Sequence, residues 1–65
     1  MTPEEVKDLD VGDWILIDDK GIMRHGEVTM VSMAPVPSIK SLNWRWWPEH
    51  IVKKLTKEKY PEYFL

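Results

Sequence analysis

The chain is predicted to be a small, mainly β domain, and three stretches of its 65 residues carry this prediction. Residues 14–17 form a β-branched and aromatic run, which is followed by turn chemistry at residues 18–21. Residues 22–32 alternate between apolar and polar side chains, as expected of a half-buried strand. Residues 39–47 resume a strand pattern after a proline-containing loop. We expect a single domain over residues 1–65, because a chain of this length supports only one small core.

The first residues predict a short helical turn. Thr2 is a suitable N-cap, and Pro3 fits the first helical position. Glu4 and Glu5 then place negative charge at the positive end of the helix dipole. Residues 10–13 break the pattern, so the segment holds only two turns and depends on packing against the rest of the chain.

The predicted first hairpin leaves a large aromatic side chain on its outer side. Ile15 and Ile17 are expected to face the core. Trp14 and Leu16 then point outward, where they require cover from the N-terminal turn, the C-terminal tail or a partner. In the next strand, Gly26 indicates a bulge or the close approach of another strand.

The second half of the chain contains a loop, a strand and an ambiguous segment. Two prolines exclude residues 34–38 from a central strand, because proline lacks a backbone donor. Residues 48–59 fit either an amphipathic helix or a single 3₁₀ turn followed by a short strand at residues 51–55. A last short turn is capped by Thr56, and the apolar residues 63–65 are expected to pack back onto the domain.

Two segments resemble small barrels of the SH3, Tudor and KOW type. The first is Val11-Gly12-Asp13-Trp14-Ile15-Leu16-Ile17, followed in the next strand by Gly26-Glu27-Val28. It is similar to the opening hairpin of these barrels, in which a Gly-Asp pair enters the first strand and a small residue lies at a strand crossing. The second is Trp47-Pro48-Glu49-His50-Ile51-Val52. It is similar to the end of SH3 domains, where an aromatic residue and a Pro-x-Asn-Tyr-Val segment form a 3₁₀ turn before the last strand.

The resemblance implies an SH3-like five-stranded barrel with a short N-terminal helical turn and a 3₁₀ or short helical C-terminal tail. It also favours a turn and a strand over a helix at residues 48–59. The ligand motifs differ, because the Ala-Leu-Tyr-Asp-Tyr segment of peptide-binding SH3 domains is absent and Ile51 replaces the closing tyrosine. Tudor cages need an aromatic side chain at the start of the second strand, where this chain has Met23, Arg24 and His25. Residues 54–58 are similar to the ending of short bacterial and phage proteins of unknown function, which implies nothing about activity.

Composition and charge narrow the class of protein. The absence of cysteine excludes disulfides and thiolate zinc sites. No apolar run approaches the length of a transmembrane span, and the first residues lack the features of a signal peptide, so we expect a soluble cytoplasmic protein. Residues 1–19 carry a net charge of −6, whereas residues 20–65 carry +4. Such asymmetry either steers a partner or is neutralised within the molecule.

The most distinctive stretch is residues 42–52, which contains three tryptophans within four residues. In a single strand, one face carries Leu42, Trp44 and Trp46, and the other carries Asn43, Arg45 and Trp47. If the first set forms the core, Arg45 and Trp47 lie on the surface with Lys40 and Lys53 nearby. A small domain has little room to bury three tryptophans, so we expect at least one at the surface, where large aromatics mark binding sites.

The candidate binding residues are Trp14, Arg45, Trp47, Lys40 and Lys53. Tryptophan and arginine are enriched at the energetically important positions of protein interfaces, which favours a protein partner. The same residues suit stacking on a nucleic-acid base with cations at the phosphates, so nucleic-acid binding is the alternative. A purely structural role for the three central tryptophans is also open. As a minor alternative, the acidic first residues mimic nucleic-acid charge and inhibit a host protein.

The sequence predicts no enzyme activity, cofactor or metal site. It contains no cysteine nucleophile, no glycine-rich phosphate loop and no serine in a nucleophile elbow. His25 and His50 have no spacing that selects a metal, and turn chemistry explains Asp18 and Asp19. We therefore interpret the chain as a small non-enzymatic interaction module with a protein partner and no membrane association.

Overall fold

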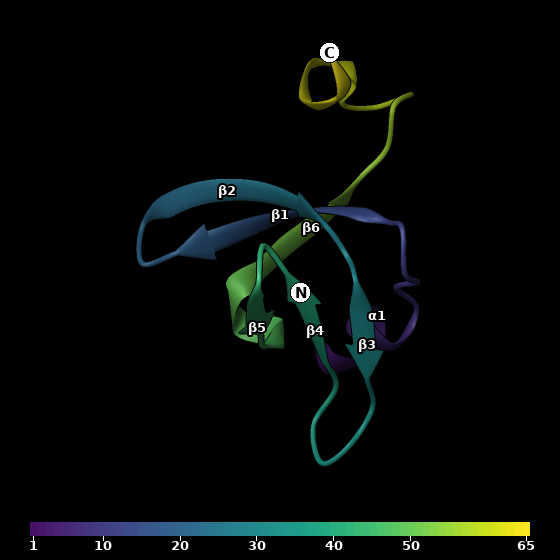
Figure 1. Cartoon of the computed structure of the whole chain (residues 1–65), viewed down its shortest axis with the longest axis vertical. Coiled ribbons are helices and arrows are strands. Elements are labelled where there is room, and N and C mark those ends of the chain that lie inside the picture. Colours follow the sequence, from purple (N-terminus) through teal and green to yellow (C-terminus); the bar gives the residue numbers. More distant parts are fainter.

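The computed structural model describes all 65 residues and contains six strands in two antiparallel sheets of three strands each (Figure 1). The first sheet has the order β2-β1-β6, with β1 at Trp14–Asp19, β2 at Ile22–Glu27 and β6 at Ile51–Leu55. The second has the order β3-β4-β5, with β3 at Met30–Ser32, β4 at Ser38–Ser41 and β5 at Trp44–Trp46. The mainly β prediction is confirmed. The five-stranded barrel is wrong, because there are six strands and the two sheets do not close.

Two of the four predicted strand segments are each divided in two, which gives six strands. The stretch 22–32 bends at Val28, whose main chain bonds the Gly12–Asp13 segment at 2.9 and 2.8 Å instead of a neighbouring strand. The stretch 39–47 reverses direction at Leu42 and Asn43, whose φ angles are 54° and 66°. Two successive residues with positive φ form the mirror-image turn of a two-residue hairpin, so this stretch becomes β4 and β5.

The N-terminal helical turn is confirmed as α1 (Pro3–Lys7). The Glu5 backbone N–H donates to the Thr2 hydroxyl at 3.2 Å, and the Thr2 backbone N–H donates to the Glu5 carboxylate at 2.9 Å, which completes a capping box. The hydrogen bond from the Thr2 backbone N–H, with a smaller contribution from the Thr2 side chain, holds the pKa of Glu5 below its usual value. Val6 is fully buried, so α1 is anchored by its one apolar residue.

The core lies between the inner faces of the two sheets. Its members are Val6, Leu9, Ile15, Ile17, Val28, Ile39, Trp46 and Ile51. The buried Trp46 indole donates to the Ser41 carbonyl at 2.9 Å, and the Ser41 hydroxyl donates to the Glu27 carbonyl at 2.8 Å. These bonds satisfy polar atoms inside the core, and through Ser41 they join β4 to both β5 and β2.

Gly26 lies where the tip of the β4–β5 hairpin crosses β2. A Cβ atom at this position would lie 2.5 Å from the Ser41 hydroxyl and 2.8 Å from Cγ of Leu42. The close approach that the sequence predicts at Gly26 is therefore confirmed. The Leu42 side chain rests on the surface that glycine leaves open, and this packing accompanies its unusual left-handed backbone.

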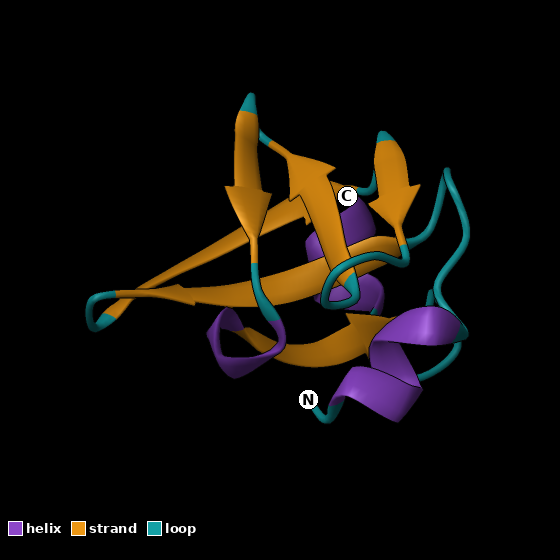
Figure 2. Cartoon of the chain, turned by 90° about the horizontal axis from the view of Figure 1, so that it is seen from below, coloured by secondary structure: helices purple, strands orange, loops and turns teal.

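The choice between a helix and a turn plus strand at residues 48–59 is settled in favour of the second. A 3₁₀ turn, η1 (Pro48–His50), leads directly into β6. β6 pairs with β1, where the register shifts between Leu16 and Ile17. The 3₁₀ turn therefore connects the two sheets (Figure 2).

The C-terminal tail, residues 56–65, packs on the outer side of the first sheet through η2 (Pro61–Phe64). Phe64 meets the Trp14 ring edge-on with centroids 5.8 Å apart, and Tyr63 meets His25 in the same way at 5.2 Å. The main-chain bonds made by Tyr60 and Tyr63 stay within the tail. Figure 1 shows the tail set apart from the two sheets. None of the helical segments is long and apolar enough to cross a membrane.

Candidate functional site

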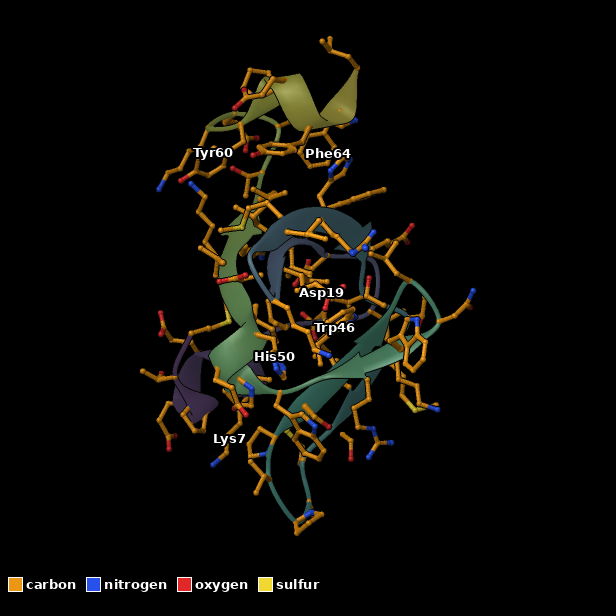
Figure 3. All side chains as sticks on the ribbon, turned by 90° about the vertical axis from the view of Figure 1, so that its left-hand side faces the viewer. Lys7, Asp19, Trp46, His50, Tyr60 and Phe64 are labelled. Carbon is orange, nitrogen blue, oxygen red and sulfur yellow. The ribbon has the colours of Figure 1, made fainter.

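A groove of about 740 Å³ opens between the tip of the β1–β2 hairpin and β5. Figure 2 shows this hairpin extending well beyond the second sheet. The groove is lined by Asp19, Lys20, Arg24, Leu42, Trp44, Arg45, Trp46, Trp47 and His50. Figure 3 labels Asp19, Trp46 and His50, which come from both sheets and the 3₁₀ turn and lie together near the middle of the molecule. The tryptophan-rich segment therefore forms one wall of a concave surface.

The three central tryptophans have different environments. Trp46 is 8% exposed and belongs to the core, whereas Trp44 is 70% exposed and Trp47 is half-buried. The expectation that Leu42, Trp44 and Trp46 share a buried face is wrong for the first two, because the turn at Leu42 and Asn43 places them at the hairpin tip. Trp44 is the most exposed of the three tryptophans that line the groove.

Arg45 and Lys40 are exposed next to each other on the second sheet, and the half-buried Trp47 follows on the chain. The Arg45 guanidinium stands 5.9 Å from the centre of the Trp47 ring, which is a cation–π distance. Lys40 is the direct cross-strand partner of Arg45 in the β4–β5 pair. These residues combine two cations with an aromatic face on one side of the second sheet.

The opposite wall adds charge that the sequence reasoning did not assign to a site. The Arg24 Nε atom donates to the Asp19 carboxylate at 2.9 Å, which ties the two strands of the first hairpin together. Lys20 occupies the hairpin turn with a φ of 53°. The groove lining therefore contains Lys20, Arg24 and Arg45 against the single carboxylate of Asp19. This balance favours a partner that carries negative charge.

His50 forms the floor of the groove beside the core. Its Nδ1 atom accepts from the Trp47 backbone N–H at 3.4 Å, and its ring packs edge-on against Trp46 with centroids 5.9 Å apart. His50 therefore holds the backbone that carries Trp47. The other histidine, His25, lies against Trp14 and Tyr63 on the outer side of the first sheet, so the two imidazoles belong to different surfaces.

The structure does not bring Trp14 and Lys53 to the groove. Trp14 is half-buried under Phe64, so the C-terminal tail supplies the cover that this outward side chain requires. The Lys53 ammonium lies 4.2 Å from the centre of the Tyr60 ring and lines a smaller pocket of about 320 Å³ with Glu5 and other residues. Part of the uneven charge is neutralised within the molecule, since Lys54 pairs with Asp13 at 3.5 Å.

Sequence reasoning placed Trp44 with the core face, and it missed Lys20, Arg24, Leu42 and His50 as groove residues. Only Leu42–Asn43 carried a local signal, because asparagine adopts positive φ more readily than most residues. The pair lacks the glycine that usually marks a two-residue hairpin. The other residues come from the first hairpin and the 3₁₀ turn, and only the tertiary arrangement brings them to the tryptophans. No family model, curated protein or solved structure matches this chain.

Proposed function

We propose that this chain is a non-enzymatic protein-interaction module that binds a segment of its partner in the groove beside β5. The observation that carries the proposal is the 70% exposure of Trp44 at the edge of a concave surface that also holds Arg45 and Trp47. Burying an aromatic side chain of this size in a contact stabilises it by about 1.5–3 kcal/mol. Tryptophan and arginine together are also the residues most enriched at interface hot spots.

We further propose that the domain is a relative of SH3-like barrels with an open arrangement of its sheets. An opening hairpin, a bent second strand, a further hairpin, a 3₁₀ turn and a last strand that returns to β1 follow one another in this chain. That order supports the resemblance carried by Gly12-Asp13 and by Trp47-Pro48. The barrel type does not identify a ligand, so the proposed function rests on the residues of the groove.

The first test is selection of peptides from a random display library on the wild-type chain and on Trp44→Ala. We expect the wild-type chain to enrich a recurrent motif that Trp44→Ala does not enrich. Val36→Ala is the matched control, because Val36 is an apolar residue that is 44% exposed but lies outside the groove. Enrichment of the same motif by all three proteins, or by none, would contradict the proposal.

The selected peptides give a quantitative prediction for Trp44→Ala. We expect peptide affinity to fall by about tenfold or more, whereas the free energy of unfolding should change by less than about 1 kcal/mol because the side chain packs little in the free protein. Isothermal titration calorimetry and urea unfolding measure the two quantities. A large loss of stability with unchanged affinity would make Trp44 a structural residue.

Nucleic-acid binding remains the second candidate, and the adjacent Lys40, Arg45 and Trp47 are the observation that favours it. We expect no binding to single- or double-stranded oligonucleotides at physiological salt, because Lys53 and Lys54 lie elsewhere and few cations remain to contact phosphates. Titration of labelled oligonucleotides at 50 and 200 mM salt checks this. Micromolar binding with a steep salt dependence that is lost in Arg45→Ala would establish the second candidate instead.

A further inference from the structure

We infer that the groove takes an extended, acidic segment of a partner protein, which adds as a strand to the free edge of β5. This inference rests on the proposed function and specifies the binding mode and the chemistry of the partner. Three features carry it: the open edge of β5, the direction of the Arg45 main chain, and the excess of cations around the groove.

The edge of β5 is unpaired within the chain. β5 forms the end of the second sheet, and its only neighbour is β4. It also forms a wall of the groove, so the unpaired edge opens onto a hollow that has the first hairpin on its other side. A free strand edge presents backbone donors and acceptors that readily pair with another chain.

The pairing of β4 with β5 determines which main-chain groups face this edge. Ser41 and Trp44 close a two-residue hairpin and therefore form a hydrogen-bonded pair. The next pair, Lys40 and Arg45, is then a non-hydrogen-bonded pair, so the main-chain N–H and C=O groups of both residues point away from the space between β4 and β5. The Lys40 carbonyl agrees with this, because it accepts from the Thr29 N–H at 2.8 Å on the far side of β4. By the same geometry, the Arg45 N–H and C=O point to the open edge.

The side chains around this edge define the chemistry of the added strand. Arg45, Arg24 and Lys20 line the groove, and the one carboxylate there, Asp19, already accepts from Arg24 Nε. A guanidinium has five N–H donors, so Arg24 retains donors for a second carboxylate. Trp44 and Trp47 supply apolar surface beside these cations. Because neighbouring side chains of a strand point to opposite faces, a segment that alternates acidic and apolar residues matches this arrangement.

The test uses two synthetic peptides, acetyl-Val-Glu-Val-Glu-Val-Glu-Val-amide and its counterpart with lysine at each glutamate. We expect the acidic peptide to bind about tenfold or more tightly than the basic one, and the preference to reverse in Arg45→Glu. Lys57→Glu makes the same change of charge on the tail, outside the groove, and should leave the preference unchanged. Equal affinity for the two peptides, or an effect of Lys57→Glu equal to that of Arg45→Glu, would overturn the assignment of an acidic partner.

Strand addition has its own readout in amide hydrogen exchange followed by NMR. We expect the Arg45 amide to exchange rapidly in the free protein and at least about tenfold more slowly when the acidic peptide is saturating, whereas the Lys40 amide should change little. Alternate N-methylation of the peptide, which removes the donors along one of its edges, should abolish binding for one of the two methylation patterns. An unchanged Arg45 exchange rate at saturation, or two methylated peptides that bind as tightly as the parent, would overturn strand addition.

The outcomes separate this inference from the proposed function. Trp44-dependent peptides that are basic, or that leave Arg45 exchange unchanged, would overturn the inference and retain an interaction module. A library that yields no Trp44-dependent peptide would overturn both. Sedimentation equilibrium of the free protein tests whether a second copy of the chain, rather than a partner, occupies the edge of β5. A dimer that protects the Arg45 amide from exchange in the absence of peptide would place a second copy on β5 and overturn the inference.

Discussion

Replacing Ile17 with alanine is expected to remove about 2–5 kcal/mol of stability, because the side chain is fully buried at the centre of the first sheet. Ile17 lies opposite Arg24 on β2 and Ile51 on β6, so its side chain occupies the point where three strands meet the core. A chain of this length has a total stability of about 3–10 kcal/mol at the usual value per residue. The substitution therefore leaves a large fraction of the protein unfolded at moderate urea concentrations.

Urea unfolding followed by circular dichroism measures this effect. Val28→Ala should also destabilise the chain, by a smaller amount because two carbon atoms rather than three are removed from an equally buried position. Val36→Ala removes the same groups as Val28→Ala from a position that is 44% exposed, and we expect little change from it. Similar midpoints for Val28→Ala and Val36→Ala would show that the bend between β2 and β3 is not part of the core.

Gly26→Ala is the second substitution with a large expected effect. The new methyl group would overlap the Ser41 hydroxyl and the Leu42 side chain, so the tip of the β4–β5 hairpin has to move away from β2. Overpacking of this kind costs about 1–3 kcal/mol, and displacement of Ser41 endangers its bond to the Glu27 carbonyl as well. We expect a lower urea midpoint together with altered NMR shifts at Trp44.

A second substitution determines whether the clash is the cause. Leu42→Ala removes the Cγ and Cδ2 atoms that lie 2.8 and 2.9 Å from the new methyl group. The loss from Gly26→Ala should therefore be smaller in the Leu42→Ala background than in the wild-type background, which a double-mutant cycle measures. Equal losses in both backgrounds would assign the effect to Ser41 or to the strand backbone rather than to Leu42.

The sequence predicted the elements whose structure is determined by a few neighbouring residues. Thr2 and Pro3 indicated α1 because capping depends on neighbouring residues alone. The 3₁₀ turn and β6 followed from the likeness of the Trp47-Pro48 segment to a known ending. The turn at Leu42 was missed because a bulky residue rarely adopts positive φ, and here the packing of its side chain on Gly26 accompanies that backbone.

The sequence predicted only some of the groove residues, because the others are brought to the groove by tertiary structure. Alternation along a strand placed Arg45 and Trp47 on the surface, and that inference needed no knowledge of the rest of the fold. The same alternation misplaced Trp44, because the turn at Leu42 and Asn43 puts it at the hairpin tip, where it is exposed although it shares β5 with the buried Trp46. Arg24 lines the groove because the β1–β2 hairpin extends past the second sheet. No local sequence pattern indicates how far this hairpin extends relative to β5. A site assembled from two sheets can be predicted only when the tertiary arrangement of those sheets is known.

The C-terminal tail is expected to detach at a lower free energy than the two sheets need to unfold. The main-chain hydrogen bonds of Tyr60 and Tyr63 close within the tail, so the tail can detach without breaking a hydrogen bond of either sheet. Its opening free energy is set by the ring contacts of Phe64 and Tyr63 and by the contact of Lys53 with the Tyr60 ring. Trypsin at low concentration should therefore cut after Lys57 and Lys59 long before it degrades the strands, as mass spectrometry of a digestion series will show. The trimmed protein would keep its core and display Trp14 on a newly bare sheet face.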